Sequence, residues 1–591
     1  MNLKRVETDV LVVGGGGAGF RAAIASKEKG TDTVLLSKGP LARCGASPMA
    51  GADFTLDGNS MNKLGREGDP NDSMGKVFND IVSQGYFLNN QRLVDQYVKT
   101  APRLLNDLMA YGLEILMSDQ RMIYAHGTHI MDVLLKKARE AGVKLFEDVM
   151  LLNLLTVDGR VSGALGLDIK SGQFISFNTR AVIMATGGWH KAFWPNTGMR
   201  DLSGEGIAMA SRAGATIGNM EFVTFCCNVM YEPPMWMGSI APYLTGLICG
   251  GKLTNSKGDD ILASYDPDLV KTGTSTEWNK SFVSYASSRE IRQGNAGQNG
   301  GVYYSRGQVS WDMFKMVCEF MFPNWKYKAL DLAPWAKMLE EDRPIEVGPA
   351  VEFFDGGIVV NERFESSIEG LYAAGECALG TFGANRVFSA ITEMLTQGLD
   401  AGENAAAYAL RNKAAPINEK VIGRMVESAE KPLSRNEGLT PGAVRREVQV
   451  KAHRYLGPIR NQRELQDFLE FLQSVRKEKL PYLSTVSKGH VYNKEWLDAI
   501  ELENILYLLE ASTRSALART ESRGVHIRED HFYTDNDNWL KESLVQYKNG
   551  RFEISHRPVT ITSMTPPTGR LPYLEMMKKM MQMHSDTGGK H

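Results

Sequence analysis

The hydrophobic pattern of the first forty residues changes its period twice. Val10–Val13 is a short apolar run rich in β-branched residues, which is typical of a parallel strand buried on both faces. Phe20–Lys29 follows a helical period, and Thr33–Leu36 is a second short apolar run. The pattern therefore predicts a strand, a helix and a second strand at the start of the chain.

Strand-like and helix-like segments continue to alternate up to about residue 235. They include the amphipathic stretch His129–Ala141, the strand Val143–Phe146 and the buried strand Ala181–Ala185. Between about 236 and 349 regular periods are lost, and aromatic residues, Gly, Ser and Pro become frequent. This change of character indicates an inserted domain.

The last third of the chain is predominantly helical in pattern. Apolar residues recur with a period near 3.6 from about 412 to 545, as in Asn461–Lys477 and Trp496–Leu517. The tail is strand-like at Val559–Thr562 and ends in a Met- and Lys-rich helix, Tyr573–Met583. That helix could offer an adaptable methionine surface to a partner, but the sequence favours an amphipathic helix docked on its own protein.

A glycine-rich run directly after the first strand indicates a nucleotide site. Gly14, Gly16 and Gly19 match the pattern G-x-G-x-x-G. The first glycine permits a tight turn, the second lets the backbone approach a pyrophosphate, and the third allows the helix to pack closely on the strand. The N-terminus of the following helix would face the phosphates.

A second signature lies more than half the chain away. Gly370–Glu376 reads G-L-Y-A-A-G-E and leads into Gly383–Arg386, which reads G-A-N-R. The turn Ala185–Gly187 reads A-T-G and recurs where such a domain returns to its cofactor. Together these runs predict one dinucleotide-binding domain that is interrupted and later completed, as in flavoproteins that hold extended FAD. The chain is therefore predicted to be a redox protein.

Composition narrows the class of protein. The 591 residues suggest three or four domains, and 43% hydrophobic with 23% charged residues describe an ordinary globular chain. The net charge of −2 gives no reason to expect nucleic acid as a partner. Six scattered cysteines without a C-x-x-C pair predict no iron–sulfur or other metal site and a reducing, cytoplasmic location. The chain enters a strand at once, and no apolar run reaches the ~20 residues of a membrane span, so neither a signal peptide nor an anchor is expected.

Two long motifs carry a resemblance to a known family. They are Gly375–Arg386 and the run Arg514–Asp530, which contains S-R-G-V-H-I-R-E-D. On these runs the chain resembles the flavoprotein subunits of succinate dehydrogenase and fumarate reductase, together with L-aspartate oxidase. A shorter stretch, Lys252–Asp260, is similar to the flavin subunit of adenylylsulfate reductase.

The resemblance implies an α/β architecture in four parts. A Rossmann-type FAD-binding domain (1–235 and 350–411) is interrupted by an α+β capping domain (236–349). A helical bundle domain (412–545) and a small C-terminal segment (546–591) follow. A small-molecule acid would bind between cap and FAD domain, and electrons would pass to a separate iron–sulfur subunit. That partner, with a membrane anchor or other redox subunits, could hold the chain at the inner membrane.

The family's covalent flavin attachment is not expected here. Gly45 stands where many members carry the histidine that forms the link, so FAD is predicted to bind non-covalently. Glu376 is expected to bind FAD hydroxyls, and the helix starting near Ser389 to face the flavin. The predicted cofactor-binding residues are Gly14, Gly16, Gly17, Ala18, Gly19, Ser37, Lys38, Arg43, Cys44, Gly45, Ala185, Thr186, Gly187, Glu205, Gly375, Glu376, Arg386, Ser389, Ala390 and Ile391.

The substrate residues of the family are partly replaced. Cys226-Cys227-Asn228 stands in place of H-P-T-G, and Thr245–Gly251 lacks the acid and arginine of the proton relay. Glu352 aligns with a second histidine and Lys280 with the proton-donating arginine, whereas Arg386 is retained. Formal positive charge falls and an acid is added, which favours a substrate with one carboxylate, or with a cationic or neutral arm for Glu352.

The candidate catalytic residues are Arg386, Lys280, Glu352 and His129. The planar fork of Arg386 suits a carboxylate. Lys280 could move a proton near neutral pH if its pKa were lowered, and His129 could line the site near the flavin. Three functions stay open: a dehydrogenase or reductase acting on a C–C bond beside a carboxylate, an electron-transfer FAD subunit without its own substrate, and an aspartate oxidase-like or adenylylsulfate reductase-like enzyme.

Overall fold

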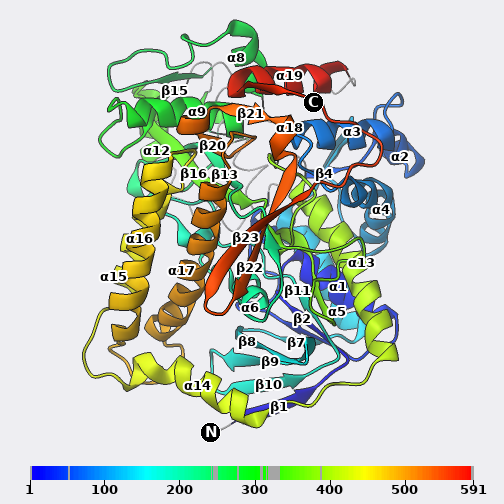
Figure 1. Cartoon of the computed structure of the whole chain (residues 1–591). Helices are drawn as coiled ribbons and strands as arrows, with labels where there is room; N and C mark the ends of the chain where they lie inside the picture. The colour runs from blue at the N-terminus through cyan, green and yellow to red at the C-terminus, as the bar shows by residue number, and fades with distance from the viewer. Residues whose placement is uncertain are drawn as a thin grey trace.

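A five-stranded parallel sheet forms the centre of the molecule (Figure 1). The computed structural model describes residues 3–50, 53–240, 243, 251–275, 278–306, 310–313, 316, 333–386 and 389–586. In spatial order the strands are β18 (Leu371–Ala373), β11 (Ala181–Met184), β2 (Val10–Val13), β3 (Thr33–Leu36) and β7 (Lys144–Phe146). All four pairings are parallel.

The order of these strands confirms the interrupted dinucleotide-binding domain. Strands β2 and β3 have the predicted bounds. Strand β18 follows the second glycine signature and pairs with β11 nearly two hundred residues earlier in the chain. Helix α1 (Gly17–Glu28) begins three residues before the predicted start, because Gly16 is already its N-cap.

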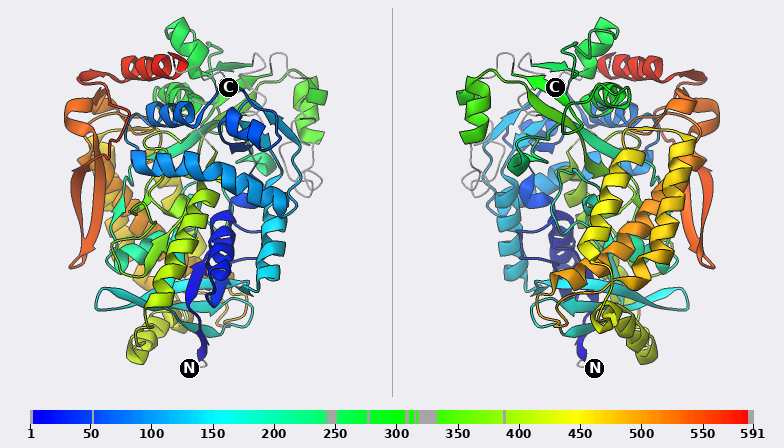
Figure 2. Two further views of the ribbon diagram at one scale, coloured as in Figure 1. Left: turned by 90° about the vertical axis from the view of Figure 1, so that its right-hand side faces the viewer. Right: turned by 90° about the vertical axis from the view of Figure 1, so that its left-hand side faces the viewer.

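Helices α1 and α13 (Ala390–Arg411) lie against each other beside this sheet (Figure 2). Two glycines of α13 allow the close approach. A Cβ on Gly398 would lie 2.5 Å from the carbonyl oxygen of Ala18, and one on Gly402 would lie 2.4 Å from that of Ala22. Both helices therefore begin on the same side of the molecule, at the carboxyl ends of the parallel strands.

The inserted region builds an antiparallel sheet of its own. The strand order is β13 (Val223–Met230), β16 (Ile345–Phe354), β15 (Val302–Ser305) and β14 (Lys252–Thr254). Helix α9 (Asn279–Arg292) packs on it, and Ser284 Oγ donates to the Phe225 carbonyl at 3.0 Å. The predicted boundaries at 235/236 and 349/350 divide this sheet, since β13 precedes the first and β16 crosses the second.

Four helices form the bundle that follows (Figure 2). They are α14 (Glu419–Ser434), α15 (Pro441–Tyr455), α16 (Gln462–Glu478) and α17 (Lys494–Ala518). Helix α17 lies innermost and is buried over most of its length.

The tail differs from its predicted pattern. Val559–Thr562 is not a strand; the strand is β23 (Arg551–Pro558), paired with β22 (Lys541–Lys548). Lys541 is the first residue of β22 and pairs with Pro558. Strand β22 therefore has no residue left to pair with Val559–Thr562. The predicted boundary at 545/546 falls inside β22, which joins a sheet with β12 (Ile217–Gly218) and β17 (Gly357–Ile358).

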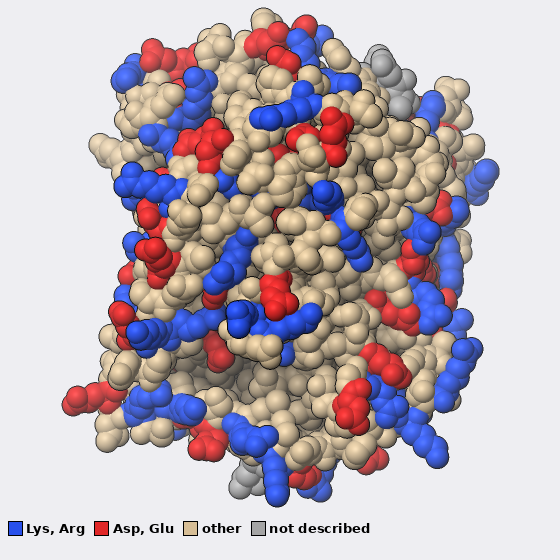
Figure 3. All heavy atoms as spheres, in the orientation of Figure 1, with Lys and Arg blue, Asp and Glu red and all other residues tan. Residues whose placement is uncertain are grey.

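The methionine-rich terminal helix is docked on the protein itself. Helix α19 (Tyr573–Asp586) packs against α3 (Met74–Gln84), and Met576, Met577, Met580 and Met581 are buried. Among the described helices, none combines the length and the apolar content needed to cross a membrane. On the face drawn in Figure 3, basic and acidic side chains are interspersed.

The remaining elements frame the central sheet. Two further sheets are β1-β10-β9-β8 and β4-β6-β5, and two short two-stranded sheets pair β19 (Ile459–Arg460) with β20 (Ile527–Arg528) and β21 (Tyr533–Asp535) with β24 (Arg570–Pro572). The strands of the first two are β1 (Leu3–Glu7), β10 (Phe174–Asn178), β9 (Arg160–Asp168), β8 (Val149–Val157), β4 (Asp53–Thr55), β6 (Met122–Tyr124) and β5 (Met117–Asp119). Helices α4 (Gln91–Ala110), α5 (Gly127–Ala141) and α6 (Glu205–Arg212) complete the layers around them.

Buried ion pairs from the R-E-D-containing motif hold the bundle to the FAD-binding domain. Arg519, at the end of α17, donates through Nε to Glu221 Oε1 at 2.7 Å, and both side chains are fully buried. Glu521 accepts from Arg519 at 2.9 Å and from Arg523 at 2.8 Å. Arg519 and Arg523 can be buried because acidic side chains pair with them, and these pairs have a structural role.

Candidate active site

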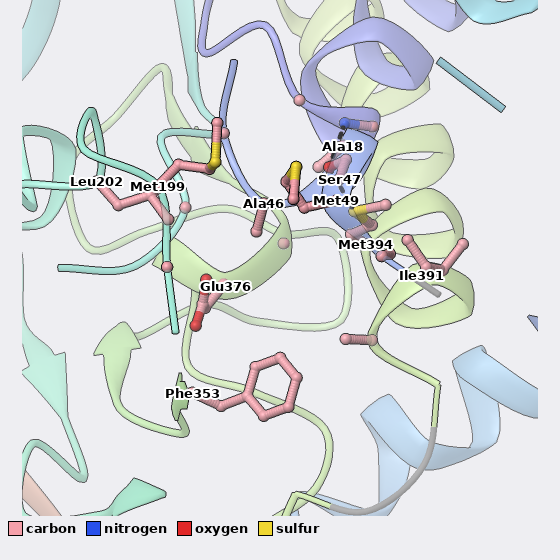
Figure 4. A pocket seen from close by; sticks show the side chains of 18 of the residues that line it. Ala18, Ala46, Ser47, Met49, Met199, Leu202, Phe353, Glu376, Ile391 and Met394 are labelled. Atoms are coloured by element: carbon pink, nitrogen blue, oxygen red, sulfur yellow. Dashed lines mark hydrogen bonds between the residues drawn. The ribbon is translucent and has the colours of Figure 1, made fainter. Parts of the chain in front are cut away.

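A cavity of about 760 Å³ opens at the carboxyl ends of the parallel strands. Its walls come from both halves of the FAD-binding domain and from the inserted sheet, as the close view in Figure 4 illustrates. Glu376 and Phe353 project toward one side of the cavity and Ser47 and Met394 toward the other. The two glycine signatures thus meet in one space.

The first glycine signature has the geometry of a pyrophosphate cradle. Gly14 has φ +125°, and a Cβ there would lie 2.0 Å from the Ala185 carbonyl oxygen. A Cβ on Gly19 would lie 1.8 Å from the Gly14 carbonyl oxygen, which explains the third glycine as a packing requirement. Gly16 and Gly17 line the cavity, where the N-terminus of α1 presents backbone N–H groups. These residues fit the diphosphate of FAD.

The loop after β3 closes one wall. Gly45 has φ +73°, and its N–H donates to Asp201 Oδ2 at 2.7 Å. Cys44 Sγ lies 3.0 Å from Ser37 Oγ. Burial, followed by the Asp201 charge, raises the pKa of the Cys44 thiol. The cavity therefore meets a neutral thiol and a glycine at the place where the family's histidine is expected.

Lys38 is compensated by acids in the wall. Its ammonium contacts Glu205, and lies 2.7 Å from Glu501 and from Ser203 Oγ. Burial alone would lower its pKa, but the two carboxylates outweigh burial and raise it. Lys38 and Glu205, both predicted to bind the cofactor, therefore neutralise each other at the edge of the cavity.

Arg386 lies in the wall with one donor group left over. Its Nε lies 3.3 Å from Asp355 Oδ1 and its Nη1 contacts Glu393; the three side chains are 1% exposed. Nη2 has no hydrogen-bond partner among the described residues. An unpaired guanidinium N–H is costly when buried, so this group is suited to an acceptor on a ligand.

Lys280 forms an ion pair with the other predicted substrate residue. Its Nζ lies 2.9 Å from Glu352 Oε2, and the side chains are 10% and 11% exposed. Burial would lower the pKa of Lys280, but the attraction of Glu352 and of the neighbouring thiols outweighs burial, and the pKa is raised. The lowered pKa expected for a proton-moving Lys280 is therefore not found, because its partner stabilises the ammonium form.

Most predicted site residues meet in the cavity wall, and five do not. Arg43 pairs with Asp132 at the surface, and Gly19 and Ser37 lie behind the wall. Ser389 caps α13 by accepting a hydrogen bond from Thr392 N at 3.1 Å. His129 lies in the first turn of α5. Cys226 and Cys227 are buried in β13, outside the wall. Residues 245–250 lie outside the described residues. The predicted residues that line the cavity are Gly14, Gly16, Gly17, Ala18, Lys38, Cys44, Gly45, Ala185, Thr186, Gly187, Glu205, Lys280, Glu352, Gly375, Glu376, Arg386, Ala390 and Ile391.

Several residues in or behind the wall were not predicted from the sequence. His190 lies between Glu376 and Glu352: its Nε2 is 3.9 Å from Glu376 Oε1 and 2.5 Å from the Glu352 carbonyl oxygen. Its position three residues after the A-T-G turn was the available signal. Asp355 and Glu393, which hold Arg386, carried no motif. They become visible only when the inserted sheet and α13 are brought together.

Comparison with known proteins agrees with this geometry. Residues 9–390 match the family model described as FAD binding domain, and residues 445–572 match the model described as Fumarate reductase flavoprotein C-term. The protein is therefore an FAD-binding oxidoreductase. It belongs to the family of fumarate reductase and succinate dehydrogenase flavoprotein subunits.

The relatives are similar over nearly their whole length. One subunit of the fumarate reductase (CoM/CoB) of Methanothermobacter marburgensis is 29% identical over 573 residues, covering 93% of this chain and 98% of the relative. A mutant of Escherichia coli quinol fumarate reductase FrdA is similar in structure, with TM-score 0.82, 25% identity and coverage of 96% and 99%. Adenylylsulfate reductase from Archaeoglobus fulgidus (TM-score 0.77, 21% identity, coverage 95% and 98%) shares the fold alone.

Proposed function

We propose that this chain is the catalytic flavoprotein subunit of an oxidoreductase that acts on the CH–CH bond beside a carboxylate. One observation carries the proposal: Arg386 lines the same cavity that contains the glycine cradle, and its guanidinium keeps one nitrogen, Nη2, without a hydrogen-bond partner among the described residues. A carboxylate on Nη2 would hold a small acid within the cofactor cavity, beside the inserted sheet.

The residues of the wall divide the chemistry between them. FAD, when bound, supplies the hydride chemistry. In the reducing direction, one carbon of the substrate double bond receives a hydride with its electron pair, and the neighbouring carbon receives a proton. Arg386 orients the carboxylate, and Lys280 is the proposed proton donor. Its raised pKa keeps it an ammonium, and the neighbouring carbon can still take the proton because that carbon becomes a much stronger base as the hydride arrives, so a lowered pKa is not needed in this direction. Glu352 holds the ammonium in place.

The cofactor is held without a covalent bond. Gly45 has no side chain to form one, and the Cys44 thiol is kept neutral by burial and by Asp201. The cradle Gly14–Gly17 and the N-terminus of α13 would hold the diphosphate and the flavin, and Glu376 would bind a hydroxyl of the ribityl chain or ribose. His190 supports the backbone of Glu352 between these regions.

The electrons are exchanged with an iron–sulfur partner protein. In the described part of the chain, no group of three or more His, Cys, Asp or Glu side chains is arranged to hold a metal ion. The Methanothermobacter marburgensis relative is by its name one subunit of a larger enzyme, which supports association with a partner subunit. Association with further subunits would also bring the chain to the inner face of the membrane.

Anaerobic flavin reoxidation tests the proposal. The purified protein is reduced photochemically and mixed with crotonate, and the flavin absorbance is followed. Reoxidation with formation of butyrate is expected, and acid precipitation of the oxidised protein should release all FAD into the supernatant. Flavin that stays with the precipitate would contradict non-covalent binding. Reoxidation by an iron–sulfur protein but by no unsaturated acid would favour an electron-transfer subunit instead.

A further inference from the structure

The charges at the substrate end of the cavity define the substrate class more narrowly. Building on the proposed function, we infer that the enzyme selects acids with a single carboxylate: the carboxylate binds Arg386, and an uncharged arm lies against the closed Lys280–Glu352 pair. A second carboxylate on the arm would be rejected.

At this end of the cavity, the positive charges of the basic side chains are fully offset by buried carboxylates. Arg386 is held by Asp355 and Glu393, and Lys280 is held by Glu352. The Phe353 ring lies beside both cations, with its centroid 5.9 Å from Arg386 Cζ and 4.6 Å from Lys280 Nζ. Two cations therefore share one end of the cavity with three acids, and these described residues leave no excess positive charge for a dianion.

Arg386 offers a site for one carboxylate. Its Nε and Nη1 are engaged by Asp355 and Glu393, which leaves Nη2. Aromatic rings flank the guanidinium, with the Phe382 centroid at 5.1 Å. A carboxylate gains a charge-assisted hydrogen bond there and satisfies a buried donor.

The Lys280 ammonium is already committed to another group. It lies 2.9 Å from Glu352 and is covered by Phe353 and by Tyr243, whose centroid is 5.7 Å away. A second substrate carboxylate would have to displace Glu352 or lie beside it unpaired, and both are costly in a buried place. Ile240, Tyr243 and Phe353 line the cavity here, and they suit an ester, alkyl or aryl group.

Fumarate and monomethyl fumarate test the inference, because they share a carbon skeleton and differ by one charge. Binding to the oxidised holoenzyme is measured by flavin absorbance, and reoxidation of the reduced enzyme gives kcat/KM. We expect the affinity for monomethyl fumarate and its kcat/KM to be at least about tenfold higher than the values for fumarate. A like-charge contact in a buried site costs more than ~1.4 kcal/mol, which corresponds to a factor of ten. Equal values, or a preference for fumarate, would overturn the inference and leave the proposed function standing.

Glu352→Gln supplies the reverse experiment. The substitution frees the Lys280 ammonium. The ratio of kcat/KM for fumarate to kcat/KM for monomethyl fumarate should therefore rise by at least about tenfold relative to the wild type. The matched control is Glu362→Gln, which removes the same charge from a surface pair with Arg92 and should leave the ratio unchanged. An unchanged ratio in Glu352→Gln with full FAD content contradicts the inference. Reoxidation by ferricyanide but by neither acid, in any variant, would overturn the proposed function and this inference with it.

Discussion

Arg386 donates through Nε to Asp355 Oδ1 across 3.3 Å, and both side chains are 1% exposed. Asp355 also accepts from Thr224 Oγ1 at 2.9 Å. Burial raises the pKa of Asp355 to about 6, against the opposing pull of Arg386. A buried acid that titrates close to neutrality thus shares the guanidinium expected to bind the substrate.

This relationship predicts a pH dependence of substrate binding. Below pH 6 Asp355 is protonated and uncharged; above pH 6 it is ionised, offsets the positive charge of Arg386 and so weakens the attraction of Nη2 for a substrate carboxylate. The dissociation constant of monomethyl fumarate, which stays ionised over this range, should rise several-fold between about pH 5 and pH 7.5, with its midpoint near 6. Flavin absorbance titrations at a series of pH values measure it.

Asp355→Asn is the control for this assignment. Asparagine keeps the size of the side chain and cannot ionise, so the dissociation constant should become nearly independent of pH over the same range. A midpoint near 6 that persists in Asp355→Asn would show that another group is responsible.

The glycine cradle gives a prediction for the cofactor. A Cβ on Gly16 would meet Ser47 Oγ at 3.2 Å and nothing else within 4 Å outside its neighbours, so a valine side chain there would extend into the space of the diphosphate. Gly16→Val should lose most of its FAD while far-ultraviolet circular dichroism stays close to that of the wild type. The FAD-to-protein absorbance ratio measures this loss.

Gly423→Ala is the matched control. Gly423 lies within α14, and a Cβ there would meet no atom within 4 Å. The alanine should leave FAD content unchanged and raise stability slightly, because alanine favours the helix by up to ~1 kcal/mol over glycine. Full FAD occupancy in Gly16→Val would contradict the assigned path of the diphosphate.

The sequence predicted the central sheet well because its signals are local. Val10–Val13 and Thr33–Leu36 are recognisable by composition, and the glycines between them require the turn that the structure has. The interrupted domain also follows from local motifs, since Gly370–Glu376 carries the signature that places β18 beside β11.

What the sequence could not predict depends on contacts between distant segments. Strand β13 pairs with β16 more than a hundred residues later, a contact that the change in composition near residue 235 does not reveal. Strand β23 has mostly exposed side chains, and its apolar alternation is limited to Phe552 and Ile554. The pKa direction of Lys280 depends on Glu352 being 2.9 Å away, which no spacing in the sequence reveals.

The buried pair Glu221–Arg519 gives a stability prediction. Glu221→Gln leaves the fully buried Arg519 with one acidic partner fewer, and Ser543 Oγ loses the carboxylate to which it donates at 2.6 Å. Loss of one partner from a buried pair should lower the free energy of unfolding by ~3–5 kcal/mol. Urea unfolding of the holoprotein, followed by circular dichroism, measures it.

An exposed pair is the comparison. Lys99 and Asp95 lie 2.6 Å apart on α4 with side chains 67% and 46% exposed. Lys99→Ala should change the free energy of unfolding by less than ~1 kcal/mol. If Glu221→Gln were no more costly than Lys99→Ala, the pair would not be what holds the helical bundle to the FAD-binding domain.

The affinity of Arg386→Lys for a carboxylate tests the account most directly. Lysine can keep an ion pair with Asp355 or Glu393, but it cannot also present the free Nη2. Monomethyl fumarate is titrated into the oxidised wild-type and variant holoenzymes at about pH 7, with flavin absorbance as the readout. The account predicts full FAD content in both and binding weaker by ~2–4 kcal/mol in the variant, or roughly 30- to 1,000-fold. Equal affinity in the two proteins, with FAD bound in each, would contradict the claim that Arg386 holds the substrate in the cofactor cavity.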